Sequence, residues 1–186
     1  MAVHGRSIDG AVSDALRAPA ASDLELEAFV VEHYDRLLRL ARLICRDAMD
    51  ATDAVQAGLE QAWRRRSSLH DPERRRAWLD RIVVREAIRI SRRRRSLLER
   101  LFGLDQDVEW IEQDAPAMAN IELRMALRTA FESLSPEQRA VVALHIYAGH
   151  SVAETADIVG APHETVRSRL RLARERLRHA LEESLA

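Results

Sequence analysis

The side chains with the clearest chemistry are arginines that recur every three or four residues in two segments of the chain. One set lies near the C-terminus and consists of Arg167, Arg171, Arg174 and Arg178. The other consists of Arg81, Arg85, Arg89 and Arg92, in a helix predicted to begin near Glu73. Residues at this spacing share one face of a helix. The guanidinium group donates hydrogen bonds in a fork that fits phosphate oxygens and base edges, so both faces are candidates for nucleic-acid binding.

The C-terminal set belongs to a predicted helix-turn-helix. Ser135 with Gln138, and Ser151 with Glu154, have the spacing of capping boxes that begin two helices. Gly160 ends the second of these, and a third helix follows after a short turn. The N-terminal residues of such a third helix contact base edges, and later residues contact phosphates. The residues predicted to contact duplex DNA are His163, Glu164, Arg167, Ser168, Arg171, Arg174 and Arg178.

The N-terminal set combines arginines with an aromatic ring, which suits single-stranded DNA because bases stack on rings and the backbone meets positive charge. The residues predicted to capture such a strand are Arg74, Trp78, Arg81, Arg85, Arg89, Arg92 and Arg93. Two plainer interpretations stay open. Trp78 can be a packing anchor, and the four-arginine run 92–95 can be a solvated helix end.

Composition excludes several classes of protein. The 186 residues are 47% hydrophobic and 32% charged, with a net charge of −1, and all 29 basic residues are arginine. No apolar run is long enough for a membrane-spanning helix, and the N-terminus lacks the apolar core of a secretory signal. We therefore expect a cytoplasmic protein without membrane insertion. The sequence lacks the common catalytic and nucleotide-binding motifs, so we expect no enzyme, no cofactor and no metal.

Cys45 is the single cysteine, so it has no partner for an internal disulfide. It lies beside the apolar stripe of the first predicted helix. A buried, inert thiol is the favoured interpretation, and a redox sensor is the alternative.

The periodicity of apolar residues predicts an all-α fold of two small helical modules. We divide the chain into a disordered tail (1–23), a first module (24–102), an acidic linker (103–119) and a second module (120–186). Charge supports the division: residues 67–102 carry eleven arginines against five acidic residues, and residues 161–178 carry six against two. Residues 103–123 carry six acidic residues and no basic one. A protein that only binds DNA has no need of such an acidic segment.

Three motifs in order resemble a known family. They are Asp50-Ala-Thr-Asp53-Ala-Val-Gln56, then Asp71-Pro72 followed by Trp78-Leu79-Asp80-Arg81-Ile82, and finally Leu134-Ser-Pro-Glu-Gln-Arg139 with Thr165-Val-Arg-Ser-Arg-Leu170. Over about residues 24–183 the chain resembles an alternative RNA polymerase sigma factor of the extracytoplasmic-function type. It departs from the family pattern at Ala57, Arg85 and Glu164, where Glu, Asn and Gly are usual, so base reading is not carried over to Arg85.

The resemblance implies specific partners. Region 2 of the family docks on the clamp helices of core RNA polymerase, here through Asp53 and Gln56, and melts the minus-ten promoter element. The loop Arg64–Asp71 and the following helix are then expected to hold the unpaired strand. Region 4 reads the minus-thirty-five element beside the polymerase flap, and the acidic linker enters the polymerase channel. The family also allows an anti-sigma factor as a partner, whose identity the sequence does not give.

Two other functions remain possible from the residues alone. The chain can be a stand-alone helix-turn-helix regulator, with residues 24–102 as a sensor or dimerisation domain. It can also be an interaction protein such as a polymerase inhibitor. The basic first module and the acidic linker count against the regulator, and the C-terminal helix pair counts against the inhibitor.

Overall fold

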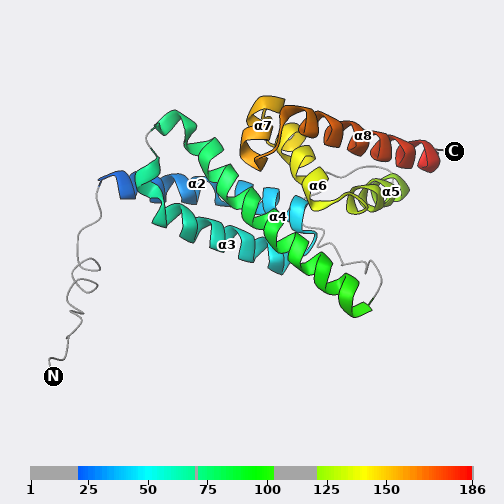
Figure 1. The fold of residues 1–186 in the computed structure, drawn as a ribbon, viewed down its shortest axis with the longest axis horizontal. Helices are drawn as coiled ribbons and strands as arrows, with labels where there is room; N and C mark the ends of the chain where they lie inside the picture. Colours follow the sequence, from blue (N-terminus) through cyan, green and yellow to red (C-terminus); the bar gives the residue numbers. More distant parts are fainter. Residues whose placement is uncertain (1–20, 70, 103–120, 186) are drawn as a thin grey trace, which may run out of the picture. The chain divides into compact units, whose positions relative to one another are not determined.

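A computed structural model of the chain describes residues 21–69, 71–102 and 121–185, and this part of the chain is built from helices (Figure 1). The α-helices are α2 (Ala21–Cys45), α3 (Ala48–Arg64), α4 (Arg75–Phe102), α5 (Ile121–Glu132), α6 (Pro136–Val142), α7 (Val152–Val159) and α8 (His163–Leu185). The predicted all-α class is confirmed. The predicted linker 103–119 lies outside the described residues, as does the predicted tail up to residue 20.

Two compact units divide the chain, residues 1–34 and residues 35–186. In the first, the beginning of α2 includes a stacked pair, with the rings of Phe29 and His33 4.1 Å apart. α2 begins at Ala21, three residues before the predicted start at Leu24, so residues 21–23 are helical and not part of a tail.

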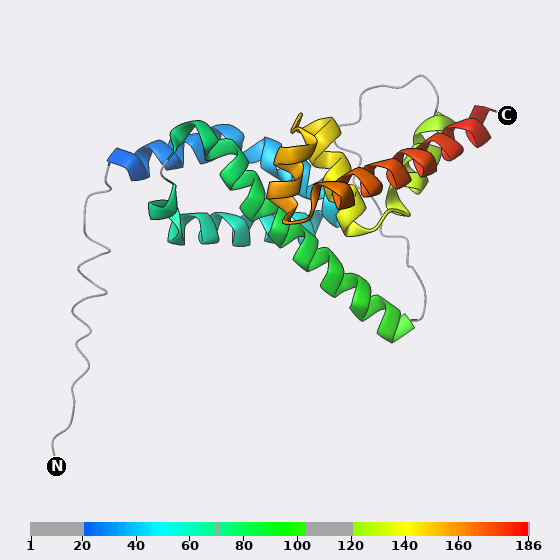
Figure 2. The ribbon, with the colours of Figure 1, turned by 45° about the horizontal axis from the view of Figure 1, so that its top comes forward.

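Within the larger unit, α3 and α4 lie side by side (Figures 1 and 2). Gly58 of α3 allows the close approach, because a Cβ there would lie 2.9 Å from a methyl carbon of Val83 on α4. The fully buried aliphatic side chains of α2, α3 and α4 include Leu37, Leu40, Ile44, Val55, Leu79, Val83 and Val84. The spacing of apolar residues along α4 predicts a buried face of Leu79, Ile82, Val83, Ala87 and Ile90. The first four are buried and Ile90 is half-buried. The helix also buries one charged side chain, Asp80, completely.

The second group of helices, α5 to α8, has its own core. Both predicted capping boxes are present, Ser135 with Gln138 at α6 and Ser151 with Glu154 at α7. Gly160 follows α7 with φ of 71°, the left-handed conformation that glycine adopts without strain. The helical spacing of Val166, Leu170, Ala173, Leu177 and Leu181 predicts a buried stripe on α8. The first three are buried and pack in the core with α6 and α7, and the last two are half-buried. The helix-turn-helix is therefore α7, the turn at Gly160, and α8.

One predicted helix differs from the structure. The periodicity predicts a continuous helix over 136–148, but α6 ends at Val142 and a wider π-turn covers Ala143–Tyr147. The backbone N–H of Ala148 donates to the carbonyl of Ala143, five residues earlier. Gly149, with φ of 75°, then turns the chain toward α7.

No helix in the described residues is long and apolar enough to cross a membrane.

Candidate nucleic-acid and polymerase interfaces

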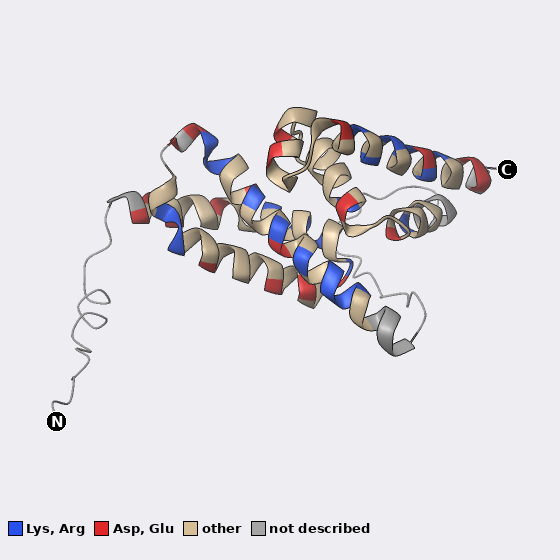
Figure 3. Cartoon of the chain, in the orientation of Figure 1, with Lys and Arg blue, Asp and Glu red and all other residues tan. Residues whose placement is uncertain are grey.

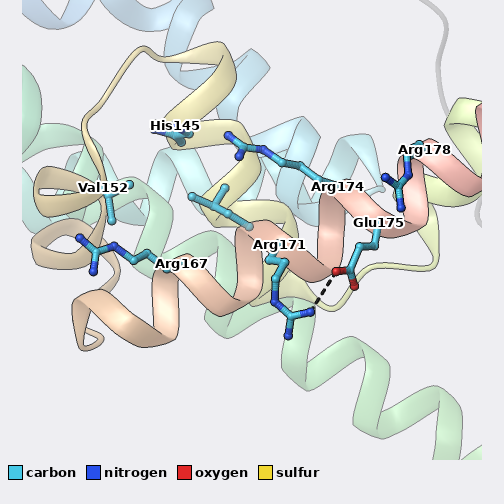
Figure 4. A pocket seen from close by; sticks show the side chains of 8 residues that line it. His145, Val152, Arg167, Arg171, Arg174, Glu175 and Arg178 are labelled. Carbon is cyan, nitrogen blue, oxygen red and sulfur yellow. Dashed lines mark hydrogen bonds and ion pairs between the residues drawn. The ribbon is translucent and has the colours of Figure 1, made fainter.

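The outward face of α8 forms a groove lined by arginines. Four arginine side chains of α8 line it together with Glu175, His145 and apolar side chains (Figure 4). These are Arg167, Arg171, Arg174 and Arg178, the set that the helical spacing predicts. His163, Glu164 and Ser168 are also exposed, at the N-terminal end of the same helix. The structure thus brings all seven predicted duplex-contacting residues onto one helix, and it adds His145 from the π-turn to the groove.

Three of these arginines form ion pairs with acidic side chains of α8 itself. Arg167 pairs with Glu164, Arg171 donates to Glu175 at 2.9 Å, and Arg178 lies 3.7 Å from Glu182. Ion pairs this exposed contribute little to stability. Phosphate groups can therefore replace the carboxylates at small cost when DNA binds.

The basic face of α4 is divided between solvent and contacts with other helices. Arg74, Arg81 and Arg93 are exposed and Trp78 is half-buried, while Arg89 donates to Glu86 within the same helix at 2.7 Å. Two predicted strand-capturing residues instead reach the second group of helices. Arg85 Nε donates to the carbonyl of Ile158 at 2.9 Å, and Arg92 pairs with Glu137.

The arginine run 92–95 is not a free, solvated helix end. Besides the Arg92 contact, Arg94 Nη1 lies 2.9 Å from Oδ2 of Asp50 and 3.0 Å from Oδ2 of Asp47, at the start of α3. Burial raises the pKa of Asp50, and Arg94 partly offsets this effect. The run therefore joins α4 to α3 through Arg94 and to α6 through Arg92.

Asp53 and Gln56 lie on the exposed face of α3. Met49 and Glu60 share this face, because positions 49, 53, 56 and 60 follow the spacing of successive helical turns. Met49 is 69% exposed, and Gln56 Nε2 makes a weak 3.4 Å contact with Glu60. In Figure 3, α3 carries mostly acidic side chains, α4 carries mostly basic ones, and α8 carries both. The face is mixed apolar and acidic, which suits a protein partner better than DNA.

Cys45 is buried, and its Sγ contacts the carbonyl of Ala87 at 3.6 Å. Burial raises the pKa of Cys45 to about 12. Because the thiolate is the reactive form, this favours the inert thiol over the redox sensor. The described residues include no cluster of histidine, cysteine and acidic side chains that could hold a metal ion.

Sequence reasoning missed a buried ionic site around Asp80, which is 0% exposed. Asp80 of α4 accepts hydrogen bonds from Arg36 of α2 and from Nε2 of His150, which precedes α7. An acidic residue between Leu79 and Ile82, on an otherwise apolar helix face, is the one local signal of it. Arg139 of α6 was missed in the same way. It is 4% exposed and donates to the carbonyls of Ile44 and Leu134.

Two family models match the chain in the order the motifs predict. Residues 29–97 match sigma-70 region 2, and residues 124–177 match sigma-70 region 4. The RNA polymerase sigma factor SigL of Mycobacterium tuberculosis, of the extracytoplasmic-function (ECF) type, is 34% identical over 89% of this chain and 94% of its own length. The chain belongs to the ECF sigma factors.

Other proteins similar to this chain are also sigma factors. ECF sigma factor SigM of Mycobacterium tuberculosis is 35% identical over 80% of this chain and 73% of its own length. RNA polymerase sigma-E factor of Streptomyces coelicolor is 33% identical over 85% of this chain and 86% of its own. The sigma factor RpoE of Bartonella quintana, solved with the anti-sigma factor NepR, has the same fold. It aligns with a TM-score of 0.68 and 24% identity, over 85% of this chain and 97% of that one.

Membership of this family decides among the three functions left open by the sequence. The chain is an alternative sigma factor that directs core RNA polymerase to promoter DNA. The match of residues 29–97 to sigma-70 region 2 is not expected of a stand-alone helix-turn-helix regulator.

Proposed function

We propose that this sigma factor recognises a promoter with two helix faces, one for each promoter element. The face of α8 reads duplex DNA at minus thirty-five, and the face of α4 holds the unpaired strand at minus ten. The observation that carries the proposal is the position of these two basic faces. Each lies in a segment that matches a different sigma region, α4 within 29–97 apart from its last turn and most of α8 within 124–177.

At minus thirty-five, the residues nearest the N-terminus of α8 supply base contacts. These are His163, Glu164, Arg167, Ser168 and Arg171. An arginine reads guanine with two parallel hydrogen bonds, and a glutamate accepts from cytosine. Arg174 and Arg178 lie one to two turns further along the helix and bind phosphates, which position the helix without reading sequence.

At minus ten, Trp78 offers a surface on which an unpaired base stacks, and the arginines of α4 hold the backbone. The exposed members, Arg74, Arg81 and Arg93, are accessible to a strand, and Arg89 is half-buried and paired with Glu86. Arg85 and Arg92 become available only after they leave Ile158 and Glu137. Melting then follows from capture, because a bound single strand removes one partner of the duplex.

The α3 face at Asp53 and Gln56 binds the clamp helices of core polymerase. Its exposed Met49 supplies apolar contact area, and its acidic residues complement basic side chains on a partner. Residues 24–102 and 120–186 act as the two binding modules, and the acidic residues 103–119 connect them along the polymerase channel. The protein acts in the cytoplasm, and an anti-sigma factor, as in the complex of RpoE with NepR, is a candidate regulator.

A run-off transcription assay with core polymerase and promoter fragments tests the proposal. Trp78→Ala is expected to reduce open-complex formation on duplex promoters, and much less on templates with a pre-melted minus-ten element. Arg171→Ala is expected to reduce transcription on both templates, because it acts at minus thirty-five. Arg128→Ala, an arginine of α5 paired with Glu132, is the matched control. Equal losses on both templates with Trp78→Ala would contradict a role in strand capture.

A further inference from the structure

The groove on α8 includes a titratable side chain that does not come from that helix. His145 belongs to the π-turn that follows α6, and it lines the groove together with the four arginines of α8. Its imidazole is half-buried, and the side chain of Arg174 extends toward it (Figure 4). Two different elements of the fold therefore present nitrogen atoms to the same part of the groove.

The turn between α6 and α7 sets the orientation of this imidazole. Nδ1 of His145 lies 2.7 Å from the carbonyl oxygen of His150. Positions five apart do not share a face of a helix, so this contact depends on the π-turn and on Gly149, whose φ of 75° turns the chain. The backbone N–H of His150 also donates to the carbonyl of Leu144 at 3.0 Å, which closes the turn.

The contact with His150 determines which nitrogen of His145 carries the hydrogen. A carbonyl oxygen only accepts hydrogen bonds, so Nδ1 is the donor. Nε2 is then the nitrogen that remains for the groove, and it has no hydrogen-bond partner among the described residues. In the neutral form of this tautomer Nε2 is an acceptor, and it becomes a donor only when it takes up a proton.

Arg174 is equally open to an anion. Of the four groove arginines, it alone pairs with no carboxylate in the part of the chain that the structure describes, because the acidic side chains of α8 pair with the other three. The charged side chains that line the groove are the four arginines and Glu175, while α7 contributes the apolar Val152. This excess of positive charge attracts a phosphate, and Arg174 can bind it without first leaving a carboxylate.

We propose that Arg174 and His145 hold one phosphate of duplex DNA between them, and that His145 takes up a proton when this phosphate binds. A phosphate diester offers only acceptor oxygens, so Nε2 can bond it only in its protonated form. The result is a charge-assisted hydrogen bond between imidazolium and phosphate, which is stronger than a bond between neutral groups. The inference rests on the proposed binding of duplex DNA by α8 and adds a contact from outside that helix.

Proton uptake makes promoter affinity depend on pH. Two ligands that favour each other's binding do so reciprocally, so a phosphate that favours the proton is itself bound more tightly when protons are abundant. Histidine is the side chain whose charge changes between pH 5 and 8. The affinity of the polymerase holoenzyme for promoter DNA therefore rises as the pH falls from 8 to 6.

Fluorescence anisotropy of a labelled cognate promoter fragment, titrated with holoenzyme at pH 6 and pH 8 and at fixed salt, tests the proposal. Every protein is the full-length chain with His163→Gln, because this second histidine at the DNA-facing end of α8 would add a proton of its own. The measured quantity is the affinity of the His145 protein divided by that of His145→Ala, so that any pH dependence of polymerase itself cancels. We expect a ratio of about ten at pH 6, the lower end of the worth of a hydrogen bond to a charged group, and a ratio near one at pH 8.

Two further variants show whether the proton is the cause. His145→Gln keeps a neutral donor at this position, so it should bind more tightly than His145→Ala by the same factor at both pH values. His179→Gln is the matched control, because His179 is an exposed histidine of α8 that pairs with Glu183 and does not line the groove. This variant should keep the full pH dependence. Circular dichroism checks that each variant retains its helix content.

A ratio that is the same at pH 6 and pH 8 would overturn the proposal, since a purely structural role of His145 does not change with protonation. Arg171→Ala in the same titration separates this result from a failure of the proposed function. If Arg171→Ala weakens binding while the His145 ratio does not change with pH, α8 still binds the promoter and only the phosphate contact at His145 is wrong. If Arg171→Ala has no effect, the assignment of α8 to duplex DNA is itself wrong.

Discussion

Nε2 of His150 donates a 2.8 Å hydrogen bond to Oδ2 of Asp80, although 70 residues separate the two in the sequence. Burial by itself raises the pKa of Asp80, but the hydrogen bonds and charges of His150 and Arg36 outweigh it and hold that pKa below its ordinary value. The ionised carboxylate is therefore the form that the fold stabilises.

The first prediction concerns this carboxylate and pH. Asp80→Ala should lower the free energy of unfolding at pH 7 by about 3–5 kcal/mol, because it leaves Arg36 and His150 around an emptied site. A lowered pKa gives stability that is complete above the unfolded-state value, near 4, and is lost as pH falls through the folded-state value. The difference between native and variant protein in urea unfolding should therefore shrink below about pH 4. The exposed carboxylate Asp53, changed to alanine, should cost under about 0.5 kcal/mol at any pH. A difference that stays constant down to pH 2 would show that the charge of Asp80 is not what matters.

The second prediction separates backbone strain from packing at Gly160. Gly149 and Gly160 both have positive φ, 75° and 71°, but a Cβ at Gly149 has nothing within 4 Å, whereas one at Gly160 meets Arg85. Gly149→Ala should cost about 1–2 kcal/mol of stability from strain alone. Gly160→Ala should cost about 1 kcal/mol more, because Arg85 must leave the carbonyl of Ile158.

Thermal unfolding of the two alanine variants, repeated in an Arg85→Ala background, completes a double-mutant cycle. The excess cost at Gly160 should disappear when Arg85 is absent. If it persists, the Arg85 contact does not form in solution.

Local features of this fold can be predicted from the sequence alone, whereas contacts between distant segments of the chain cannot. The capping boxes at Ser135 and Ser151, the glycine turn at Gly160 and the buried stripe of α8 are local patterns, so the sequence alone predicts them. The site at Asp80 joins three segments that lie far apart in the chain, and no local pattern connects Arg36 with His150. Arg85 looks like one more exposed arginine until the end of α7 is placed beside it.

The third prediction concerns promoter reading by α8. Arg167→Ala and Arg171→Ala should each weaken binding of polymerase holoenzyme to the cognate promoter by about 1–3 kcal/mol, and much less on DNA with an altered minus-thirty-five element. Arg178→Ala should weaken binding equally on both DNAs and flatten the dependence on salt, as expected of a phosphate contact. Competition binding at several salt concentrations measures both effects. Uniform losses for all three variants would mean that α8 does not read bases directly.

The last prediction concerns the α3 face and core polymerase. Asp53 and Gln56 are exposed and make no contact with the second group of helices among the interactions of the described residues, so changing them should leave the fold and α8 intact. Asp53→Arg should reduce capture by core polymerase at least tenfold, about 1.4 kcal/mol, because it places a like charge against a complementary surface. Gln56→Ala should act in the same direction, and both should lower run-off transcription in proportion. Glu183→Arg, a charge reversal at the end of α8, is the control and should leave capture unchanged.

A gel shift with duplex promoter and free sigma factor, run beside the core-polymerase pull-down, decides between weak capture and damaged DNA contacts. Free protein should bind duplex weakly whichever α3 variant is used, since each basic face makes only a few phosphate contacts and polymerase must hold both faces at promoter spacing to raise their effective concentration. Tight, sequence-specific duplex binding by the isolated chain, unaffected by Asp53→Arg, would show that promoter recognition does not depend on polymerase.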